Sequence, residues 1–284
     1  MEALPYIKSF QGKTVVVKYG GSTLGLSEVV RNICLDMVFL KCVGIHPVLV
    51  HGGGPEISQA MKDKGKKAEF VQGLRVTDRE TMQITLEVMT RTNAALVDLI
   101  VRGGGEAKGV VSGAAGAGRF LSARKKAAKD EKGNPVDIGF VGEVTGVDTG
   151  LLRGMHEGGS NIIPVIAPIA VGEDGQLYNV NADHAASEVA VALKAHKLVF
   201  LTDVQGIRGA PEGQGPLLSS LHARDVEDLI RQGVASGGMV PKVRACARAL
   251  AGGVAKTHII DGRVMHSLLL EVFTDEGIGT EIVQ

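Results

Sequence analysis

Short apolar runs that end in glycine recur along the chain, and stretches with helical spacing follow them. The first run, residues 13–19, is continuous and rich in β-branched side chains, as expected of a strand covered on both faces. It ends in the Gly-Gly-Ser-Thr of residues 20–23, and residues 28–43 then repeat apolar side chains at helical spacing. A second run, residues 45–50, ends in the His-Gly-Gly-Gly of residues 51–54. Because the order of strand, glycine loop and helix occurs twice, the pattern predicts right-handed βαβ units and a largely parallel sheet.

A long helix is predicted in the next part of the chain. Residues 77–80, Thr-Asp-Arg-Glu, have the spacing of a capping box, in which Thr77 and Glu80 bind each other's free backbone amides at a helix start. The helix that follows has a stripe of side chains at steps of three and four, namely Met82, Leu86, Met89, Asn93, Leu96 and Ile100. We interpret this stripe as the face that packs on the sheet. Its width leaves a symmetric helix–helix contact between two copies of the chain as an alternative.

The rest of the chain continues the alternation of strands and helices. Residues 122–137 are basic and contain the turn signal Gly-Asn-Pro at residues 133–135, which predicts a solvated hairpin rather than a nucleic-acid surface, because no aromatic residues interleave with the charges. Strands are expected at residues 108–112, 139–146, 161–170, 197–201, 257–260 and 280–283, and helices at 147–157, 184–195, 223–232 and 243–250. The fold class is therefore α/β, an open, mostly parallel sheet with helices on both faces. Residues 1–284 form a single domain, with a lobe boundary near residues 170–178.

Composition narrows the class of protein. The 284 residues hold 31 Lys+Arg and 31 Asp+Glu, and the formal net charge of zero offers no overall field for nucleic acid or an acidic membrane. No signal peptide and no run of eighteen apolar residues is found, so a cytoplasmic enzyme is expected. Cys34, Cys42 and Cys246 have no zinc-like spacing and lie among apolar neighbours, which predicts buried free thiols. The 39 glycines are about twice the average usage.

Several of these glycines fall where ligands bind in parallel sheets. Ligands lie beyond the carboxyl ends of such strands, where helices begin with free amides. Residues 20–21, 52–54, 202–206 and 237–238 all occupy such positions, and a strongly anionic ligand, most simply a phosphate, would explain the repetition. The chain has neither G-x-x-x-x-G-K-[ST] nor a G-x-G-x-x-G between a strand and a helix. A P-loop NTPase and a standard dinucleotide dehydrogenase are therefore disfavoured.

Two lysines and an aspartate suit phosphoryl transfer, which needs charge neutralisation and in-line positioning. Lys18 ends the first strand beside a glycine pair, and Lys242 lies at a helix start after another. Asp183 ends the sequence Asn-Val-Asn-Ala-Asp, residues 179–183, which alone would be read as a turn. As an expected N-cap, Asp183 could hold both lysines in place. Taken singly, Lys18 could equally be a solvated strand end and Lys242 a surface helix lysine.

Arg75 and His51 are the remaining candidates. The guanidinium of Arg75 has apolar neighbours in the sequence and a rigid fork that suits a carboxylate, with a structural salt bridge as the alternative. His51 precedes three glycines and could be mistaken for a general base. A carboxylate that accepts a phosphoryl group needs no base, so we interpret His51 as structural.

These motifs together resemble the amino acid kinase family, and within it the branch that phosphorylates N-acetyl-L-glutamate. The matching stretches run over nearly the whole chain: VVVKYGGS, LVHGGGPEI, GLRVTD, GFVGEV, YNVNADHAA, LTDVQGI, GGMVPKV and HIIDGRVMHSLLLEVFTDEGIGTEI. The resemblance implies the amino acid kinase fold, a three-layer αβα sandwich. Its N-terminal lobe, about residues 1–175, would bind the acylated amino acid and form the dimer, and its C-terminal lobe, about residues 176–284, would bind the nucleotide.

The resemblance also implies a reaction and the residues that perform it. The γ-phosphoryl group of ATP would pass to the side-chain carboxylate of N-acetyl-L-glutamate, giving N-acetyl-L-glutamyl 5-phosphate in arginine biosynthesis. Mg²⁺ would be bridged by the ATP phosphates, with no direct protein ligand. The catalytic residues would be Lys18, Lys242, Asp183, Gly20 and Gly21; the substrate-binding residues Gly52, Gly53, Arg75, Asn179 and Asn181; and the nucleotide-binding residues Thr202, Asp203, Val204, Gln205, Gly206, Ile207, Gly237, Gly238 and Met239.

Assembly and regulation follow from the same resemblance. It implies a homodimer, leaves a hexamer open, and places an arginine effector site at His258, Glu271 and Gly277. A PII-type signalling protein is a further candidate partner. The chain departs from the family pattern at Ser22, where Asn is usual, and at residues 114–115, where Ala-Ala replaces Lys-Asp. The alternatives are a kinase for another acylated amino acid and a non-catalytic arginine-sensing regulator on the same fold.

Overall fold

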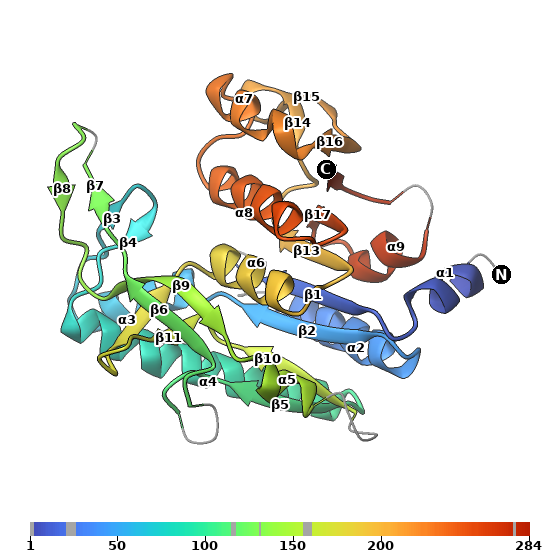
Figure 1. Ribbon diagram of the computed structural model, residues 1–284, viewed down its shortest axis with the longest axis horizontal. Helices are drawn as coiled ribbons and strands as arrows, with labels where there is room; N and C mark the ends of the chain where they lie inside the picture. Colours follow the sequence, from blue (N-terminus) through green and yellow to red (C-terminus); the bar gives the residue numbers. More distant parts are fainter. Residues whose placement is uncertain (1–2, 21–26, 115–117, 131, 156–160, 275–276) are drawn as a thin grey trace.

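One twisted eight-stranded sheet runs through the centre of the molecule (Figure 1). The computed structural model describes residues 3–20, 27–114, 118–130, 132–155, 161–274 and 277–284. The strands follow the order β16 (Ser220–His222), β18 (Thr280–Val283), β17 (Lys256–Asp261), β13 (Lys197–Thr202), β1 (Thr14–Tyr19), β2 (His46–His51), β10 (Ile162–Ile166) and β5 (Glu106–Val110). Neighbours are parallel except β17 and β18. The predicted open, mostly parallel sheet is confirmed.

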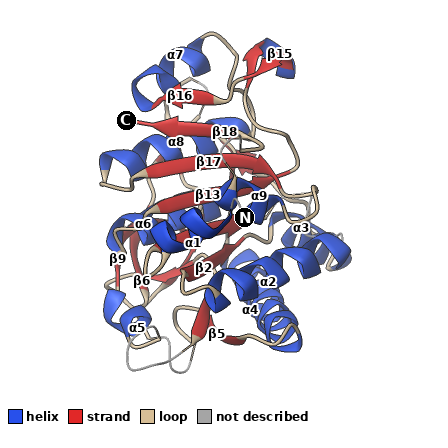
Figure 2. Ribbon diagram, turned by 90° about the vertical axis from the view of Figure 1, so that its right-hand side faces the viewer, coloured by secondary structure: helices blue, strands red, loops and turns tan. Residues whose placement is uncertain are grey.

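Strand β1 lies between β2 and β13, with helices packed on both faces. Its side chains alternate between two hydrophobic clusters, with Val15 and Val17 in one and Val16 in the other. The first cluster contains side chains of α1 (Ala3–Phe10), α2 (Ser27–Cys42), α4 (Arg79–Arg102) and α9 (Ser267–Phe273). The second contains side chains of α6 (Ala182–Ala192) and α8 (Met239–Ala251). This arrangement is the expected three-layer αβα sandwich. Figure 2 shows strands of the sheet, among them β18, β17 and β13, lying across the view one above another.

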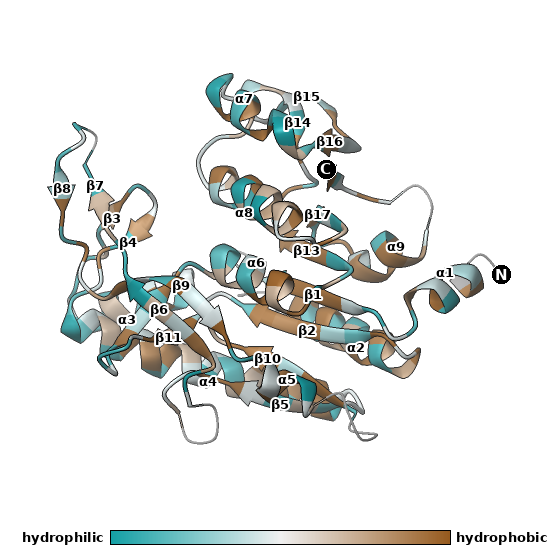
Figure 3. Cartoon of the chain, viewed as in Figure 1, coloured by the Kyte–Doolittle hydropathy of each residue, from teal (hydrophilic) through white to brown (hydrophobic). Residues whose placement is uncertain are grey.

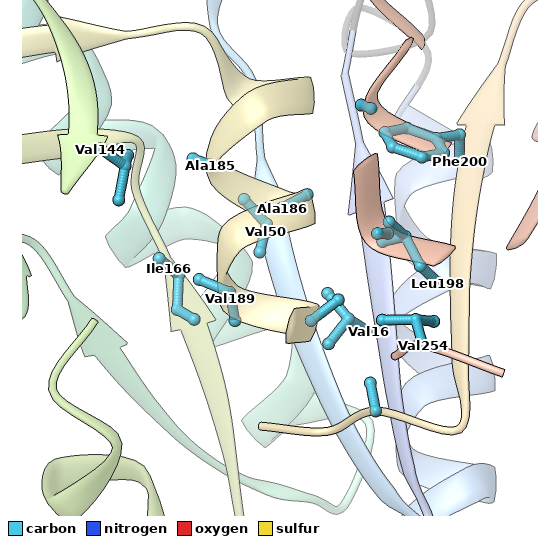
Figure 4. Close-up of a cluster of buried hydrophobic side chains, with 14 of the residues drawn as sticks. Val16, Val50, Val144, Ile166, Ala185, Ala186, Val189, Leu198, Phe200 and Val254 are labelled. Atoms are coloured by element: carbon cyan, nitrogen blue, oxygen red, sulfur yellow. The ribbon is translucent and has the colours of Figure 1, made fainter. Parts of the chain in front are cut away.

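The close contact between α6 and the sheet depends on small side chains. Ala185, Ala186 and Val189 of α6 lie against strand residues such as Val16 and Val50 (Figure 4), and all five are fully buried. Hydrophobic residues dominate β1 and β2 (Figure 3), as required of strands that no water reaches. Because α6 packs so closely, its first turn lies directly beside the carboxyl end of β1.

A small closed barrel of four strands adjoins the sheet and was not predicted from the sequence. It contains β6 (Leu121–Lys125), β9 (Val141–Val147), β11 (Ile169–Val171) and β12 (Leu177–Val180). Residues 161–170, expected as one strand, divide at Ala167-Pro168 into β10 of the sheet and β11 of the barrel. Proline has no amide to donate to a ladder, which favours such a break. Through β12, the barrel brings residues 179–183 to the edge of the sheet.

Shorter elements complete the chain. The expected basic hairpin is present as β7 (Ala128–Lys129) and β8 (Pro135–Val136), an antiparallel pair with Gly133 at a positive φ of 85° in its turn. The others are α3 (Gly54–Asp63), α5 (Thr149–Arg153), α7 (Val226–Arg231), the 3-10 helices η2 (Pro211–Gly213) and η3 (Ala223–Asp225), and the antiparallel pairs β3 (Phe70–Val71) with β4 (Leu74–Arg75) and β14 (Arg208–Ala210) with β15 (Gln214–Leu217). Within the described residues, no helix has the length and apolar character needed to cross a membrane.

Two local predictions are wrong. The N-cap of α4 is Asp78, whose carboxylate accepts from the amide of Thr81 at 2.8 Å, and not Thr77 in a capping box. The Thr77 hydroxyl donates to the carbonyl of Arg75 instead. Of the cysteines, Cys34 and Cys246 are buried free thiols as expected, but Cys42 is exposed at the last position of α2.

Candidate active site

Most of the predicted catalytic and substrate-binding residues converge on one cavity of about 200 Å³, the Lys18 cavity. It lies at the carboxyl ends of β1 and β2, between the start of α3, the β3–β4 hairpin and the start of α6. Its lining includes Lys18, Gly52, Gly53, Arg75, Asn179, Asn181 and Asp183. The volume is below the ~300–1,000 Å³ of pockets for drug-sized ligands, which suits a small metabolite. Parallel strands explain only part of this convergence: the carboxyl ends of β1 and β2 meet at one edge of the sheet and bring Lys18 beside Gly52 and Gly53. Residues 179–183 reach the same edge through β12 of the barrel, and Arg75 through the β3–β4 hairpin.

A buried carboxylate joins the two distant lysines. The Nζ of Lys18 lies 2.8 Å from Oδ1 of Asp183, and the Nζ of Lys242 donates to Oδ2 at 3.2 Å. Lys18 and Asp183 are only 5% and 4% exposed, so the alternative that Lys18 is a solvated strand end is wrong. Lys242, in the first turns of α8, is more open and also donates to the carbonyl of Gly238 at 3.3 Å. The Lys18–Asp183–Lys242 cluster therefore has two positive groups and one negative group.

Burial and charge act against each other in this cluster. Burial penalises the ammonium of Lys18 and lowers its pKa below the usual 10.5, although Asp183 favours the charged form. Burial would also raise the pKa of Asp183, but the two ammonium groups together hold its pKa below 3.8. Asp183 is thus a carboxylate, and the cluster presents net positive charge to an incoming anion.

Asn181, rather than Asp183, caps α6. Its side-chain oxygen accepts from the amides of Asp183 at 2.9 Å and His184 at 3.0 Å, so the expectation that Asp183 is the N-cap is wrong. Asp183 lies in the first turn of the helix instead. This position leaves both oxygens of its carboxylate for the two lysines.

Two glycine loops meet beside Lys18. A Cβ on Gly20 would lie 3.0 Å from the Cα and N of Gly52 and 3.2 Å from the Nζ of Lys18, so only glycine permits this approach. Gly21 lies outside the described residues. The amide of Gly52 donates to the carbonyl of Tyr19 at 2.7 Å, and the expectation that this amide is directed at a ligand does not hold. The Gly53 amide makes no hydrogen bond within the described part of the chain, and Gly53 is the N-cap of α3, where free amides favour anions.

Arg75 reaches the other end of the cavity without a carboxylate partner. It is 7% exposed, and its guanidinium donates to the carbonyl of Gly54 and to the hydroxyl of Ser58, both at 2.8 Å. The salt-bridge alternative is wrong, because no Asp or Glu among the described residues lies within ion-pair distance of it. Burial lowers the pKa of Arg75, and no opposite charge compensates. Asn179 is tied to the same region, since its side-chain amide donates to the hydroxyl of Thr77 at 3.3 Å.

His51 has no role as an exposed base. The ring is completely buried, burial lowers its pKa to about 4, and its Nδ1 lies 2.9 Å from the carbonyl oxygen of Gly52. Its other nitrogen lies 3.1 Å from the side-chain amide of Asn93. The structural interpretation of His51 is confirmed.

Most of the predicted nucleotide-binding residues lie together after β13. Asp203, Val204, Gln205, Gly206, Ile207 and Met239 line a cavity of about 420 Å³, the Val204 cavity. Thr202 supports its loop, because its hydroxyl donates to the carbonyl of Val204 at 2.9 Å. Asp203 is near enough to Lys18 to favour its charged form. Gly237 and Gly238 do not join this cavity; they line another of about 740 Å³ between the β3–β4 hairpin and α8.

The predicted effector residues also meet. His258, Glu271 and Gly277 line a cavity of about 540 Å³, the His258 cavity, between α1, α9 and the strands of the C-terminal edge. The ring Nδ1 of His258 lies 2.6 Å from Oε1 of Glu271, and both side chains are buried. A Cβ on Gly277 would lie 3.1 Å from the Glu271 carboxylate, so this glycine permits the turn to pack closely on it.

Sequence reasoning missed several residues in and beside the Lys18 cavity. The ring of Phe70 lies under the guanidinium of Arg75, with 4.8 Å from Cζ to the ring centroid. Met89 packs so closely on Gly53 that its sulfur would lie 2.9 Å from a Cβ there. Ser58 binds Arg75 as described above. Met89 was assigned only to a packing stripe, and no motif marked Phe70 or Ser58. Their contacts arise from chain segments far apart in sequence, which local patterns cannot pair.

Comparisons with known proteins agree with the resemblance to the amino acid kinase family that the sequence motifs indicate. The model of the amino acid kinase family matches residues 13–261. The acetylglutamate kinase of Heliobacterium modesticaldum is 52% identical over 289 residues, which cover 100% of this chain and 96% of that protein. Two structures of N-acetylglutamate synthase from Neisseria gonorrhoeae have TM-scores of 0.86 and 0.82, each at 28% identity. The first is complexed with coenzyme A and N-acetyl-glutamate and the second with coenzyme A and L-arginine. They cover 100% and 99% of this chain, which spans 62% and 64% of the synthase chains.

Proposed function

This chain belongs to the amino acid kinase family, and we propose that it transfers the γ-phosphoryl group of ATP to the side-chain carboxylate of N-acetyl-L-glutamate. The observation that carries the proposal is the Lys18 cavity, which has the buried Lys18–Asp183 pair, joined by Lys242, at one end and an uncompensated Arg75 at the other. An acceptor with two carboxylates matches these two positive ends. The full-length identity of 52% to an acetylglutamate kinase supports this acceptor over others.

The acceptor is held in the Lys18 cavity, mostly by residues of the N-terminal lobe together with Asn179 from β12. The α-carboxylate binds the guanidinium of Arg75, whose fork matches carboxylate geometry, and Asn179 orients the same end. The side-chain carboxylate then points toward Lys18. An ionised carboxylate is already nucleophilic, so no residue has to remove a proton.

The nucleotide is held by the C-terminal lobe, in the Val204 cavity. As the γ-phosphoryl group moves, its charge is neutralised by the ammonium groups of Lys18 and Lys242, which act as point charges that follow its oxygens. Asp183 keeps both ammonium groups in place. The amide of Gly53, at the start of α3, adds a fixed dipole at the Lys18 cavity. Magnesium would be held by the ATP phosphates, as the resemblance to the family implies, and would neutralise part of their charge.

A panel of acceptors tests the proposed reaction. ADP formation from ATP is measured with N-acetyl-L-glutamate, glutamate, aspartate and N-acetyl-aminoadipate as alternative acceptors. We expect the largest kcat/KM with N-acetyl-L-glutamate. Preference for N-acetyl-aminoadipate would support the alternative of a kinase for another acylated amino acid, and activity with none would support the regulator.

Arginine binding in the His258 cavity is a second candidate function. Glu271 and Glu281 supply carboxylates to that cavity, which suits a guanidinium, and the related synthase has been solved with L-arginine. A ligand that binds only the folded protein stabilises it, by about 2.7 kcal/mol at a concentration of 100 Kd. Arginine should therefore raise the melting temperature, whereas citrulline, which lacks the charge, should not. Equal effects of both compounds would contradict the assignment.

The exposed side of α4 is the proposed contact of a homodimer. Val101 is 51% exposed on this helix, near a shallow cavity lined by Ala94 and Val97. A twofold contact uses the same patch on both copies, so Val101→Glu would place two like charges together. We expect this variant to sediment as a monomer where the wild-type chain sediments as a dimer.

A further inference from the structure

His51 and Asn93 form a hydrogen-bonded pair that no part of the reaction described above uses. His51 is the last residue of β2 and is completely buried, and Asn93, 3% exposed, reaches it from α4. The side-chain amide of Asn93 donates to the carbonyl of Val165 at 2.8 Å and lies 3.1 Å from Nε2 of His51. A Cβ on Gly109 of β5 would lie 2.2 Å from the Asn93 oxygen, so a glycine there makes room for this side chain.

These contacts determine where the imidazole carries its proton. Only a donor can face the carbonyl of Val165, so the Asn93 nitrogen, and not its oxygen, points that way. The same nitrogen faces Nε2 of His51, which must then be an acceptor without a proton. The proton of the neutral ring is therefore on Nδ1, which donates to the carbonyl oxygen of Gly52 at 2.9 Å.

The hydrogen bond to Gly52 fixes a peptide plane. The carbonyl of Gly52 and the amide of Gly53 belong to one peptide group, and no described peptide bond is cis. In a planar trans peptide these two groups point in opposite directions. With the carbonyl held by the buried ring, the Gly53 amide points away from it, and Gly52 and Gly53 line the Lys18 cavity. A peptide between two glycines otherwise has few steric barriers to turning over.

We propose that His51 and Asn93 are positioning residues that aim the Gly53 amide into the Lys18 cavity for the transferring phosphoryl group. This inference rests on the proposed function for its kinetic consequence. Neither residue touches the substrate. Asn93 sets the tautomer, His51 holds the Gly52 carbonyl, and the amide at the other side of the peptide becomes a fixed donor, which needs no reorganisation during the reaction.

Two substitutions of His51 separate this role from general packing. In His51→Asn, the side-chain nitrogen can take the place of Nδ1 and still donate to Gly52. In His51→Gln, the side-chain amide group lies where Nε2 was. The hydrogen bond with Asn93 can then persist, while the hydrogen bond to the carbonyl of Gly52 is lost. Loss of one preorganised donor lowers kcat by about 100-fold or more, so we expect this loss in His51→Gln but a kcat within about tenfold of wild type in His51→Asn. KM for ATP should stay unchanged in both.

His46, at the opposite end of the same strand, provides a matched control. His46→Gln makes the same chemical change about 16 Å along β2, at the usual rise per strand residue, and should not alter kcat. Melting temperatures of all three variants report the contribution to stability. The positioning role is wrong if His51→Asn and His51→Gln lose kcat equally, or if the losses of kcat follow the losses of stability.

The ring itself gives a readout that does not depend on activity. The ¹⁵N spectrum of His51 in the purified wild-type protein should show a protonated Nδ1 and a bare Nε2 at neutral pH. A protonated Nε2 would overturn the inference even if the kinase is active. If no acceptor is phosphorylated, the proposed function fails, while the spectrum still decides whether the pair holds the Gly52 carbonyl.

Discussion

Replacing Asp183 with asparagine removes the charge that Lys18 and Lys242 share and leaves the side-chain volume nearly unchanged. Lys18 is 5% exposed, and its Nζ lies 2.8 Å from the lost charge. At an effective dielectric constant of 20, a unit charge at that distance is worth about 6 kcal/mol of direct attraction. Because burial already disfavours the ammonium, removing one partner of such a pair should lower the free energy of unfolding by about 3–5 kcal/mol.

Lys18→Met provides the contrast. It removes a buried charge and leaves Asp183 with Lys242 at 3.2 Å, so the remaining carboxylate keeps a counter-charge. We expect a smaller loss of unfolding free energy, about 1 kcal/mol or less. Both variants should lose at least about 100-fold in kcat, since each removes fixed positive charge or its placement at the transferring group.

Urea denaturation followed by circular dichroism measures the stability of the three proteins, and a coupled ADP assay measures kcat. The reasoning predicts that Asp183→Asn is the least stable and that Lys18→Met is nearly as stable as wild type but inactive. If Asp183→Asn unfolds at the wild-type urea concentration, Asp183 does not organise the lysines. If Lys18→Met is less stable than Asp183→Asn, the packing of the Lys18 side chain stabilises the fold by more than the burial of its charge destabilises it.

Three further predictions follow from single contacts. Arg75→Lys loses the planar guanidinium that holds the acceptor, so KM for N-acetyl-L-glutamate should rise about tenfold or more, equivalent to about 1.4 kcal/mol. KM for ATP should stay unchanged, and an equal rise in both KM values would refute this role. Burial, opposed by the hydrogen bond from His266, raises the pKa of Asp36 from 3.8 to about 6. The native carboxyl therefore keeps its proton where the unfolded chain has lost it, and wild-type stability falls by up to roughly 3 kcal/mol as the pH rises from about 4 to about 7. Asp36→Asn lacks this loss, so its stability relative to wild type should increase over the same range in urea denaturation, and a constant difference would contradict the shift. Gly20→Ala places a Cβ 3.0 Å from the Gly52 backbone and should lower kcat at least about tenfold, and wild-type turnover in that variant would show that the loops can separate freely.

Much of the fold was predictable because buried parallel strands have a clear pattern. Residues 13–19 and 45–50 are rich in apolar and β-branched side chains, and both form central strands of the sheet. The convergence of Lys18 with Gly52 and Gly53 was predictable from the same rule, since the carboxyl ends of β1 and β2 meet at one edge. Asp183 reaches that edge through β12 of the barrel. The barrel was not predictable, because β6, β9 and β12 are only partly buried and lack a continuous apolar pattern. The single apolar run of residues 161–170 also conceals a change of sheet at Pro168.

The site was less predictable in its polar details. Asn93 follows the spacing of an apolar stripe, and only the structure pairs it with His51 across 42 residues of sequence. Asn181 and Asp183 both favour helix starts, and the choice between them depends on the two lysines, which occupy the Asp183 carboxylate. Local pattern gives the residue types at such positions, whereas tertiary contacts decide which atom each one binds.

The most direct test of the account is the chemical identity of the product. An acyl phosphate reacts with hydroxylamine to give a hydroxamate, so ATP, N-acetyl-L-glutamate and the wild-type chain should yield ADP and hydroxamate in equal amounts. Omitting the acceptor, or using Lys18→Met, should abolish both products. ADP formation without hydroxamate, or hydroxamate formation at the wild-type rate in Lys18→Met, would contradict phosphoryl transfer to the carboxylate at the Lys18–Asp183–Lys242 cluster.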